Sequence, residues 1–484
     1  MKSRLIHILL AVALTLVPLG YSSALDTRLP DLGASASAIM TPAQERELGQ
    51  AFMRSIRRNQ VLLDDPLISD YIQQLGSKLV ENSDAGGQNF EFFVIDNPQI
   101  NAFAGPAGHI GVFTGLILTS DTESELAAVM AHEIAHVTQQ HLFRAWETAG
   151  NMSLTNAAVL LAAIAVGLAA GSDAGAAAAI GGQAALLQQQ INFTRANEKE
   201  ADRIGIEILA ASDFEPRAMP AFFTRMGKGN QLYQTKVPEF LLTHPVSSSR
   251  TADALGRASN FPYTQTKDDL RYQLLRADLQ QREYNDPHAA IVDFQRLLEA
   301  GRHRNRSATQ YGLARAQIRA KRLKEANDIL HALLQKHPDA VELIVTKATV
   351  EADLGLTRQA LQRLETALLK LPSSYAVNIA YAEVALAEGE YAAALQHLED
   401  YSLYRSQDPR VHYLMSRAAG EMGDRLQAHH HLSEYHYLSG NLDAAILQLE
   451  IALESRDIGF YESSRIESRL REIKKESADR EARE

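Results

Sequence analysis

The sequence predicts a mainly α-helical protein with a small β-hairpin or sheet, followed by an α-solenoid of repeated helix pairs. Three observations support this fold class. Residues 123–141 carry apolar side chains at helical spacing without Gly or Pro, and residues 90–95 and 108–113 read as two short strands. Alanines in the second half recur with a period of 34 residues, which is typical of paired antiparallel helices.

The N-terminus has the three parts of a secretory signal peptide. Lys2 and Arg4 precede a mostly apolar run, residues 5–20, and the small residues at 22–24 provide a cleavage site. The run is shorter than the roughly 20 residues of a spanning helix, so we expect cleavage of residues 1–24 and export rather than an uncleaved anchor. The chain contains no cysteine, so packing and metal must stabilise it without disulfides.

Composition limits the function classes. A length of 484 residues allows two or three domains, and a hydrophobic content of 46% permits sizeable cores. The net charge is −11, and acidic and basic residues are interspersed. Nucleic-acid binding calls for a basic patch, so we expect no nucleic-acid partner.

A helix signal precedes the two strands. Residues 25–38 read as an extended mature N-terminus. Thr41 then suits the N-cap of a helix and Pro42 its first position, so we expect a helix to begin there.

The helix predicted at residues 123–141 carries the pattern H-E-x-x-H at His132, Glu133 and His136. Residues four apart share one helix face, so both imidazoles can bind one metal ion. Glu133 can take a proton from a water molecule on that ion. The pattern is the signature of a helix-borne zinc hydrolase, with one Zn²⁺ per chain.

Catalytic zinc needs a third protein ligand and an open position. A second apolar-periodic helix opens with Glu198, and Asp202 follows one turn later on the same face. We therefore predict that Glu198 is the third ligand. Asp202 is predicted to accept a hydrogen bond from a ligand imidazole, which fixes the tautomer of that ring and raises its basicity.

Two other residues are alternative third ligands. His141 follows the first motif, but Gln139 and Leu142 stand where a metzincin has Gly and His, so His141 reads as a helix-end histidine. Glu200 lies on a different helix face from Asp202 and reads as a solvated charge.

The paired motifs resemble the gluzincin metallopeptidases that include the CAAX prenyl proteases and the HtpX-type membrane proteases. The resemblance covers residues 41–250, and it implies a sheet edge beside the active helix, on which an extended substrate pairs through its main chain. Three further stretches are similar to the family: residues 101–104 leading to 114–116, residues 124–131, and Thr243-His244-Pro245 with the later Arg250. The sequence departs from the family's pattern at residues 105–109, which affects only the local turn there.

The resemblance also implies roles for His244 and Arg250. Both are candidates to stabilise the oxyanion of the tetrahedral intermediate together with the metal. His244 has a second implied role as a fourth metal ligand, which would close the open position in a latent state. A plain turn histidine before Pro245 is the remaining interpretation.

Residues 157–187, between the two metal motifs, are almost continuously small and apolar. In integral-membrane relatives this region carries spanning helices, but here the run is short and contains Gly167 and Gly171. It reads as a buried helical hairpin that covers the cleft and could move as a lid. Peripheral membrane or substrate contact is the alternative.

The second half repeats with the tetratricopeptide period of 34 residues. Arrays of this kind form concave peptide-binding surfaces. Less regular units are expected around Ala290 and Ala445, and Pro338 and Pro372 are expected to follow helix ends. The register comes from Ala326, Ala360, Ala394 and Ala428, with Gly355, Gly389 and Gly423 each five residues before an alanine.

As a whole, the chain resembles exported family members in which the protease is fused to such repeats. This resemblance implies a Gram-negative periplasmic zinc endopeptidase and chaperone-like factor. It would degrade unfolded or misassembled outer-membrane β-barrel proteins, promote their assembly, and contact the barrel-assembly machinery through its repeats. The expected domains are a signal peptide at 1–24, a gluzincin zinc metalloprotease domain at 25–265, a tetratricopeptide-repeat α-solenoid at 266–462, and a charged C-terminal helix or tail at 463–484.

A second interpretation is a chaperone or scaffold that binds barrel-assembly components through its repeats and has a largely latent protease site. The complete set of zinc-binding residue types argues against a dead enzyme. A prenyl-processing membrane protease is disfavoured, because the sequence lacks clear spanning helices.

Overall fold

The computed structural model describes residues 40–144, 195–232, 239–264, 269–454 and 459–481. Thr41–Glu484 form one compact unit. The predicted signal peptide, the apolar segment 157–187 and the domain boundary after residue 265 lie outside the described residues and stay predictions. Among the residues that are described, no helix combines the length and the apolar character needed to cross a membrane.

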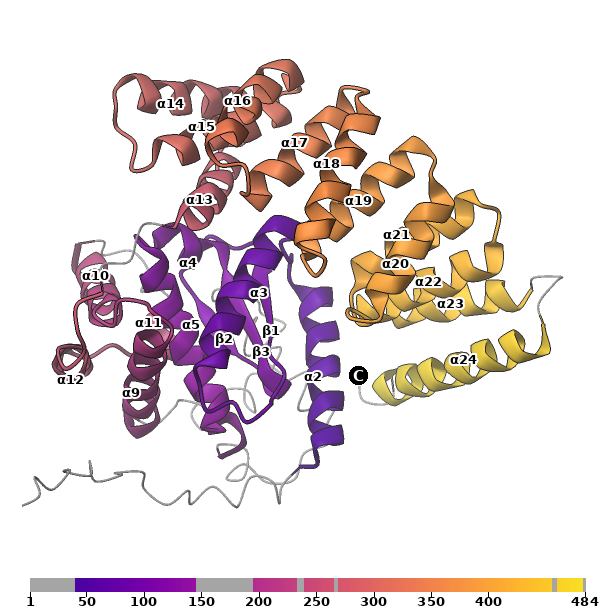
Figure 1. Cartoon of the computed structure of the whole chain (residues 1–484). Helices are drawn as coiled ribbons and strands as arrows, with labels where there is room; N and C mark the ends of the chain where they lie inside the picture. Colours follow the sequence, from indigo (N-terminus) through magenta and orange to yellow (C-terminus); the bar gives the residue numbers. More distant parts are fainter. Residues whose placement is uncertain (1–39, 145–194, 233–238, 265–268, 455–458, 482–484) are drawn as a thin grey trace, which may run out of the picture. The chain divides into compact units, whose positions relative to one another are not determined.

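A three-stranded sheet lies within the N-terminal half (Figure 1). It consists of β1 (Glu91–Ile95), β2 (Ala102–Ala104) and β3 (His109–Phe113), in the order β1-β3-β2. Strand β1 is parallel to β3, and β2 is antiparallel to β3, with Ala102 opposite Val112. The strands predicted at residues 90–95 and 108–113 correspond to β1 and β3, which are parallel. The antiparallel hairpin is β2–β3, and β2 lies in the stretch 101–104 that resembles the family.

The two faces of the sheet pack against different helices. Val94 and Val112 belong to a core shared with α3 (Pro66–Glu81) and α5 (Glu123–Thr138). The other face is aromatic: the ring of Phe103 lies 6.3 Å from that of Phe52 in α2 (Pro42–Asn59). Because side chains alternate along a strand, the sheet separates α2 from α3 and α5.

Helix α2 begins as the sequence predicts. The Thr41 side chain accepts a hydrogen bond from the backbone N–H of Gln44, and the Gln44 side chain accepts one from the backbone N–H of Thr41. Pro42 occupies the first turn. This reciprocal cap satisfies N–H groups that have no partner within the helix.

Helix α5 is shorter than predicted, because it ends at Thr138 instead of continuing to residue 141. Gln140 has a left-handed backbone with φ of 54°, and a new helical turn begins at His141. A non-glycine residue rarely adopts positive φ, and the apolar pattern gives no sign of the break.

The other helices of the N-terminal half surround α5. Helices α9 and α10 pack directly on it, and α12 packs on both α9 and α10. Their bounds, with two short neighbouring helices, are α4 (Thr114–Thr119), α9 (Arg195–Ala211), α10 (Ala218–Leu232), α11 (Glu239–Thr243) and α12 (Ser248–Ala258).

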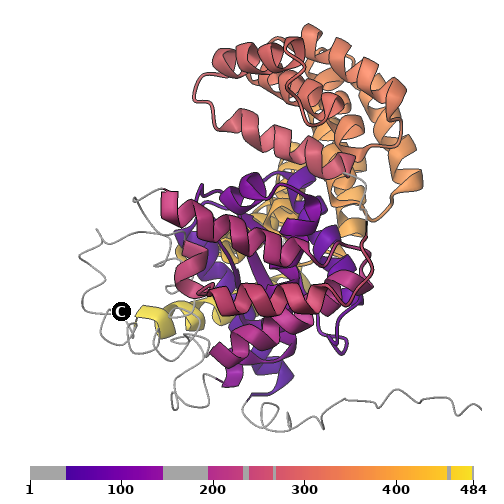
Figure 2. The ribbon, with the colours of Figure 1, turned by 90° about the vertical axis from the view of Figure 1, so that its left-hand side faces the viewer.

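The second half forms the predicted solenoid of antiparallel helices, stacked pair after pair (Figures 1 and 2). Ala326, Ala360 and Ala394 are fully buried near the start of α16, α18 and α20, where they let neighbouring helices approach closely. Gly355, Gly389 and Gly423 lie in the preceding turns with φ of 78°, 86° and 81°. The helices are α13 (Leu270–Arg282), α14 (Pro287–Glu299), α15 (Arg306–Arg319), α16 (Leu323–Lys336), α17 (Val341–Asp353), α18 (Thr357–Lys370), α19 (Tyr375–Glu388), α20 (Tyr391–Ser402), α21 (Pro409–Glu421), α22 (Arg425–Leu438), α23 (Leu442–Leu453) and α24 (Phe460–Glu481).

The charged C-terminal segment is a helix whose apolar side chains are buried. Ile466 and Ile473 of α24 pack in a core with residues of α22 and α23. Glu476 of the same helix pairs with Arg54 of α2 at 2.6 Å. Of the two forms expected for this segment, a charged helix or a tail, the described residues form the helix, and two isoleucines at helical spacing give it a packed face.

The repeats share a hydrophobic core with the N-terminal half. The buried Tyr272 hydroxyl of α13 lies 2.7 Å from the carbonyl oxygen of Ser120 and donates to this end of α4. At a second contact, the Ser374 hydroxyl donates to the buried carboxylate of Asp70 in α3 at 2.8 Å. These contacts join the solenoid to the helices that support α5.

Candidate metal centre

Helix α5 carries the two histidines of the H-E-x-x-H motif on one buried face. The Nε2 atoms of His132 and His136 lie 3.0 Å apart, and both side chains are almost fully buried. Glu133 is also buried, with its carboxylate beside the backbone N–H of Ala104 in β2. The motif thus faces the short edge strand β2 from inside the protein.

Helix α9 brings Glu198 to the two imidazoles. Its Oε1 lies 3.4 Å from His136 Nε2, and its Oε2 lies 3.5 Å from His132 Nε2. A close approach of the two helices makes this possible: a Cβ atom at Gly205 would lie 3.2 Å from the backbone nitrogen of His132. A larger residue at position 205 would push α9, and Glu198 with it, away from α5.

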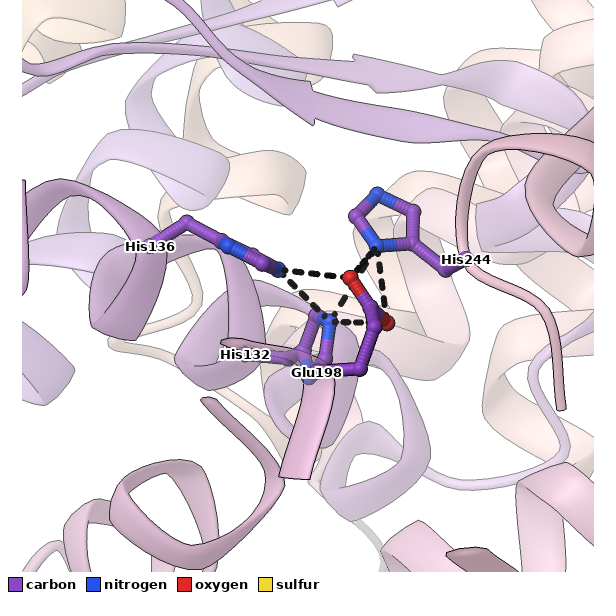
Figure 3. Close-up of side chains that lie close together, drawn as sticks. All are labelled: His132, His136, Glu198 and His244. Atoms are coloured by element: carbon purple, nitrogen blue, oxygen red, sulfur yellow. Dashed lines mark hydrogen bonds and ion pairs between the residues drawn. The ribbon is translucent and has the colours of Figure 1, made fainter. Parts of the chain in front are cut away.

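His244, directly after α11, completes the cluster from a third direction (Figure 3). Its Nδ1 lies 3.3 Å from His132 Nε2 and 3.1 Å from Glu198 Oε1. Its Nε2 points toward Glu133, 3.4 Å from Oε1. The ring packs on Phe240, with the ring centres 5.1 Å apart, so an aromatic contact supports this orientation.

The four side chains fit a tetrahedral metal ion. One ligand atom from each of His132, His136, Glu198 and His244 lies within 4.8 Å of the others, and all four residues are buried. Ligand atoms about 2.0–2.1 Å from a tetrahedral ion are about 3.3 Å apart, which is close to the observed separations. Imidazole and carboxylate donors of this kind suit a divalent cation.

The carboxylates of the cluster stabilise positive charge at the neighbouring imidazoles. Burial opposes the charge of Glu198, yet His244, His132 and His136 hold its pKa well below the usual value. Burial alone would lower the pKa of His132, but hydrogen bonds to Asp202 and Glu198 raise it to about 9. Burial lowers the pKa of His136 well below its usual value, so this ring keeps its lone pair at neutral pH.

Asp202 and Arg250 form the layer behind the ligands. Asp202 Oδ1 lies 3.0 Å from His132 Nδ1, where a carboxylate can hold the tautomer that leaves Nε2 free. Arg250 binds both oxygens of Asp202, at 2.8 and 2.7 Å, and also contacts Glu198 Oε2 at 2.7 Å. The buried guanidinium further donates to the Pro245 carbonyl oxygen at 2.9 Å, which ties the His244 turn to the same network.

Two nearby residues, His141 and Glu200, have partners that their sequence-based interpretation did not include. His141 is fully buried beyond the end of α5, and its Nδ1 lies 2.7 Å from His136 Nδ1. Glu200 is about a third exposed, and its carboxylate lies 3.1 Å from His141 Nε2 and 3.4 Å from an Arg144 nitrogen. Only the left-handed turn at Gln140 brings these residues together, and no sequence signal marks that turn.

The fold and the cluster define a metallopeptidase whose active helix precedes a repeat solenoid. A family model for peptidase family M48 matches residues 66–258, and one for the tetratricopeptide repeat matches residues 352–418. The beta-barrel assembly-enhancing protease of Yersinia pestis is 33% identical over 447 residues, covering 92% of each chain. That of Escherichia coli is 32% identical over 476 residues, covering 98% of this chain and 97% of the relative. The mitochondrial metalloendopeptidase OMA1 of Danio rerio is 29% identical over 231 residues, covering 46% of this chain and 48% of the relative.

This chain belongs to the family of the beta-barrel assembly-enhancing proteases, in which a family M48 peptidase is combined with tetratricopeptide repeats. It is a metalloendopeptidase. The predicted enzyme class and the predicted fold class are thereby confirmed.

Proposed function

We propose that this protein is a periplasmic zinc endopeptidase that degrades misassembled outer-membrane β-barrel proteins and promotes their assembly. The observation that carries the catalytic part is the buried cluster of four donors with Glu133 beside it. The names of the full-length relatives support the link to β-barrel assembly. The predicted cleavage of residues 1–24 supports export to the periplasm.

His132, His136 and Glu198 would hold the zinc ion. Bound there, zinc supplies a Lewis acid for a water molecule and the scissile carbonyl. Glu133 acts as the general base, and burial raises the pKa of its carboxyl group toward the range in which it can accept and return a proton. It then delivers the proton to the leaving amine.

The substrate lies along β2 in this proposal. This strand is at the end of the β1-β3-β2 order and next to the carboxylate of Glu133. An extended peptide that pairs with β2 through its main chain would place its scissile bond near the base. Selection would then depend on an unfolded, extended segment rather than on a particular side chain.

Arg250 acts on the ligands in this proposal. Its guanidinium is engaged by Asp202, Glu198 and the Pro245 carbonyl oxygen, so in the observed conformation it orients the two carboxylates. A role as oxyanion donor would require it to leave these buried partners. His244 is the better placed of the two candidates, because its ring lies among the ligands and beside Glu133.

His244 also acts as a brake in this proposal, which means that it holds the protease in a latent state. A tetrahedral ion held by all four donors has no position left for water or substrate. In that state the Nε2 of His244 would also face the general base, so one side chain controls both parts of the site. The enzyme becomes active when the turn after α11 moves His244 out of the cluster.

The repeats are the proposed contact with the barrel-assembly machinery or its precursors. Tetratricopeptide arrays bind peptides on their concave surface, and here the array is joined to the helices behind α5. Residues 157–187 stay a candidate for peripheral membrane or substrate contact. Neither proposal requires catalysis, so binding and cleavage can be separated by experiment.

The closed arrangement of His244 favours a second candidate function, a scaffold whose protease site is largely latent. Complementation of a strain that lacks the protein distinguishes the two. We expect the Glu133→Gln protein to restore only part of outer-membrane β-barrel assembly and none of the degradation of stalled precursors. Full restoration of assembly by this variant would favour the scaffold.

A further inference from the structure

The two histidines of α5 have different partners on the side away from the cluster. His132 Nδ1 lies 3.0 Å from the carboxylate of Asp202. His136 Nδ1 lies 2.7 Å from Nδ1 of His141 instead, and His141 Nε2 lies 3.1 Å from Glu200 Oε2. A histidine that binds metal through Nε2 carries its proton on Nδ1, so His136 must donate to His141.

The tautomer of His141 follows from its two contacts. Its Nδ1 must accept from His136, so its proton is on Nε2, where it is donated to the carboxylate of Glu200. His141 is fully buried, so this pair of contacts is shielded from water. The result is an unbroken chain of donors and acceptors from the cluster to a carboxylate at the surface.

The backbone conformation after α5 makes the contact between His141 and His136 possible. On a continuous helix, a residue five positions after His136 would lie about 140° round the axis and point elsewhere. Helix α5 stops at Thr138, and the left-handed Gln140, at φ of 54°, turns the chain so that His141 returns to His136. Positive φ at a non-glycine residue is unfavourable, so the surrounding contacts hold this conformation.

We propose that His141 is a positioning residue for the metal centre, which holds the ring of His136 in its ligating tautomer and orientation, and that Glu200 in turn holds His141. This inference rests on the proposed role of His136 as a zinc ligand. Outer partners of metal-ligating histidines are worth about 10–100-fold in metal affinity when removed. His141 touches neither substrate nor the reacting atoms, so its effect should appear first in metal binding.

Zn²⁺ affinity, measured by competition with a chelator on the full chain, tests the proposal. His141→Phe fills the space without an acceptor, and we expect affinity to fall about 10–100-fold. His141→Asn places an amide oxygen near the position of Nδ1 and should restore most of the affinity. Equal losses in the Phe and Asn variants would mean that ring packing, not the hydrogen bond, matters, and would overturn the proposal.

Glu200→Gln tests the contact between Glu200 and His141 without changing the buried cluster. We expect weaker Zn²⁺ binding than in the parent, because the neutral amide holds His141 less strongly. Glu207→Gln is the matched control, since Glu207 lies on the same helix and forms a surface ion pair with Arg203. Parent-like Zn²⁺ affinity in both variants would contradict a role for Glu200 and overturn the proposed chain from Glu200 through His141 to His136.

The parent protein separates this inference from the proposed function. If the parent binds no zinc, the proposed catalytic function fails. If the parent binds zinc and His141→Phe, shown to be folded by its unfolding transition, binds it equally well, only the positioning role fails. Should His141→Phe not fold, the comparison of Glu200→Gln with Glu207→Gln still decides.

Discussion

Nε2 of His244 lies 3.4 Å from Oε1 of Glu133, so the ring that joins the ligand cluster also faces the proposed general base. Its Nδ1 is at the same time 3.3 Å from His132 Nε2. A single side-chain movement could therefore open a ligand position and expose the base together. In the described structure the protease site is in the arrangement that we assign to the latent state.

His244→Ala should raise or deregulate cleavage of casein. Removing the ring removes the fourth donor, and activity should increase by as much as the inverse of the fraction of protein that is normally open, about tenfold if about a tenth is open. Peptidase rates of parent and variant, each corrected for zinc content, measure this. Plain inactivity with full zinc content would favour the oxyanion role of His244 over the brake.

Glu133→Gln should abolish proteolysis and leave the metal in place. The amide has nearly the same shape but cannot accept the proton, so we expect a loss of at least about 100-fold. Casein cleavage and metal content measured on the same preparation check both statements. Cleavage that persists in this variant would reject Glu133 as the base.

Arg250→Met should destabilise the protein even before catalysis is measured. The change leaves the buried carboxylates of Asp202 and Glu198 without their shared cation, and losing one partner of a buried ion pair costs about 3–5 kcal/mol. Urea unfolding of the metal-free protein measures the loss. Arg257→Met, which removes a half-exposed pair with Asp253 on the same helix, is the control and should have little effect.

Glu123, at the start of α5, should make stability depend on pH. Burial raises the pKa of the Glu123 carboxyl group to about 7. A hydrogen bond from the Tyr71 hydroxyl, 2.6 Å away, only partly offsets this rise. Between about pH 4.5 and about pH 7 the unfolded chain loses this proton while the folded chain keeps it, so the free energy of unfolding falls as pH rises.

Glu123→Gln stays neutral at every pH and isolates this effect. Its stability relative to the parent should increase from pH 4.5 to pH 7 and then level off. Urea unfolding of both proteins across this range provides the comparison. A constant difference between the two proteins would show that Glu123 titrates alike in the folded and unfolded states.

Local sequence signals predicted those parts of the fold that depend on local rules. Thr41 and Pro42 mark the start of α2 because capping involves only neighbouring residues. The spacing of His132 and His136 places both on one helix face, and the repeat period locates the solenoid helices. Glu198 and Asp202 could be chosen because they fall one turn apart on a second helix.

Features that depend on tertiary contacts could not be read in this way. The parallel pairing of β1 with β3 joins residues that no local pattern relates. The contact between buried His141 and Glu200 requires the strained turn at Gln140, which competes with an otherwise favourable helical pattern. The packed face of α24 likewise depends on tertiary contacts, here with the two preceding helices α22 and α23.

Metal content of the natively purified protein tests the central claim most directly. Elemental analysis should find one zinc ion per chain in the parent and much less in Glu198→Ala, which lacks the third ligand, whereas Glu207→Ala on the same helix should retain it. Absence of metal from the parent, or full occupancy in Glu198→Ala, would contradict the account.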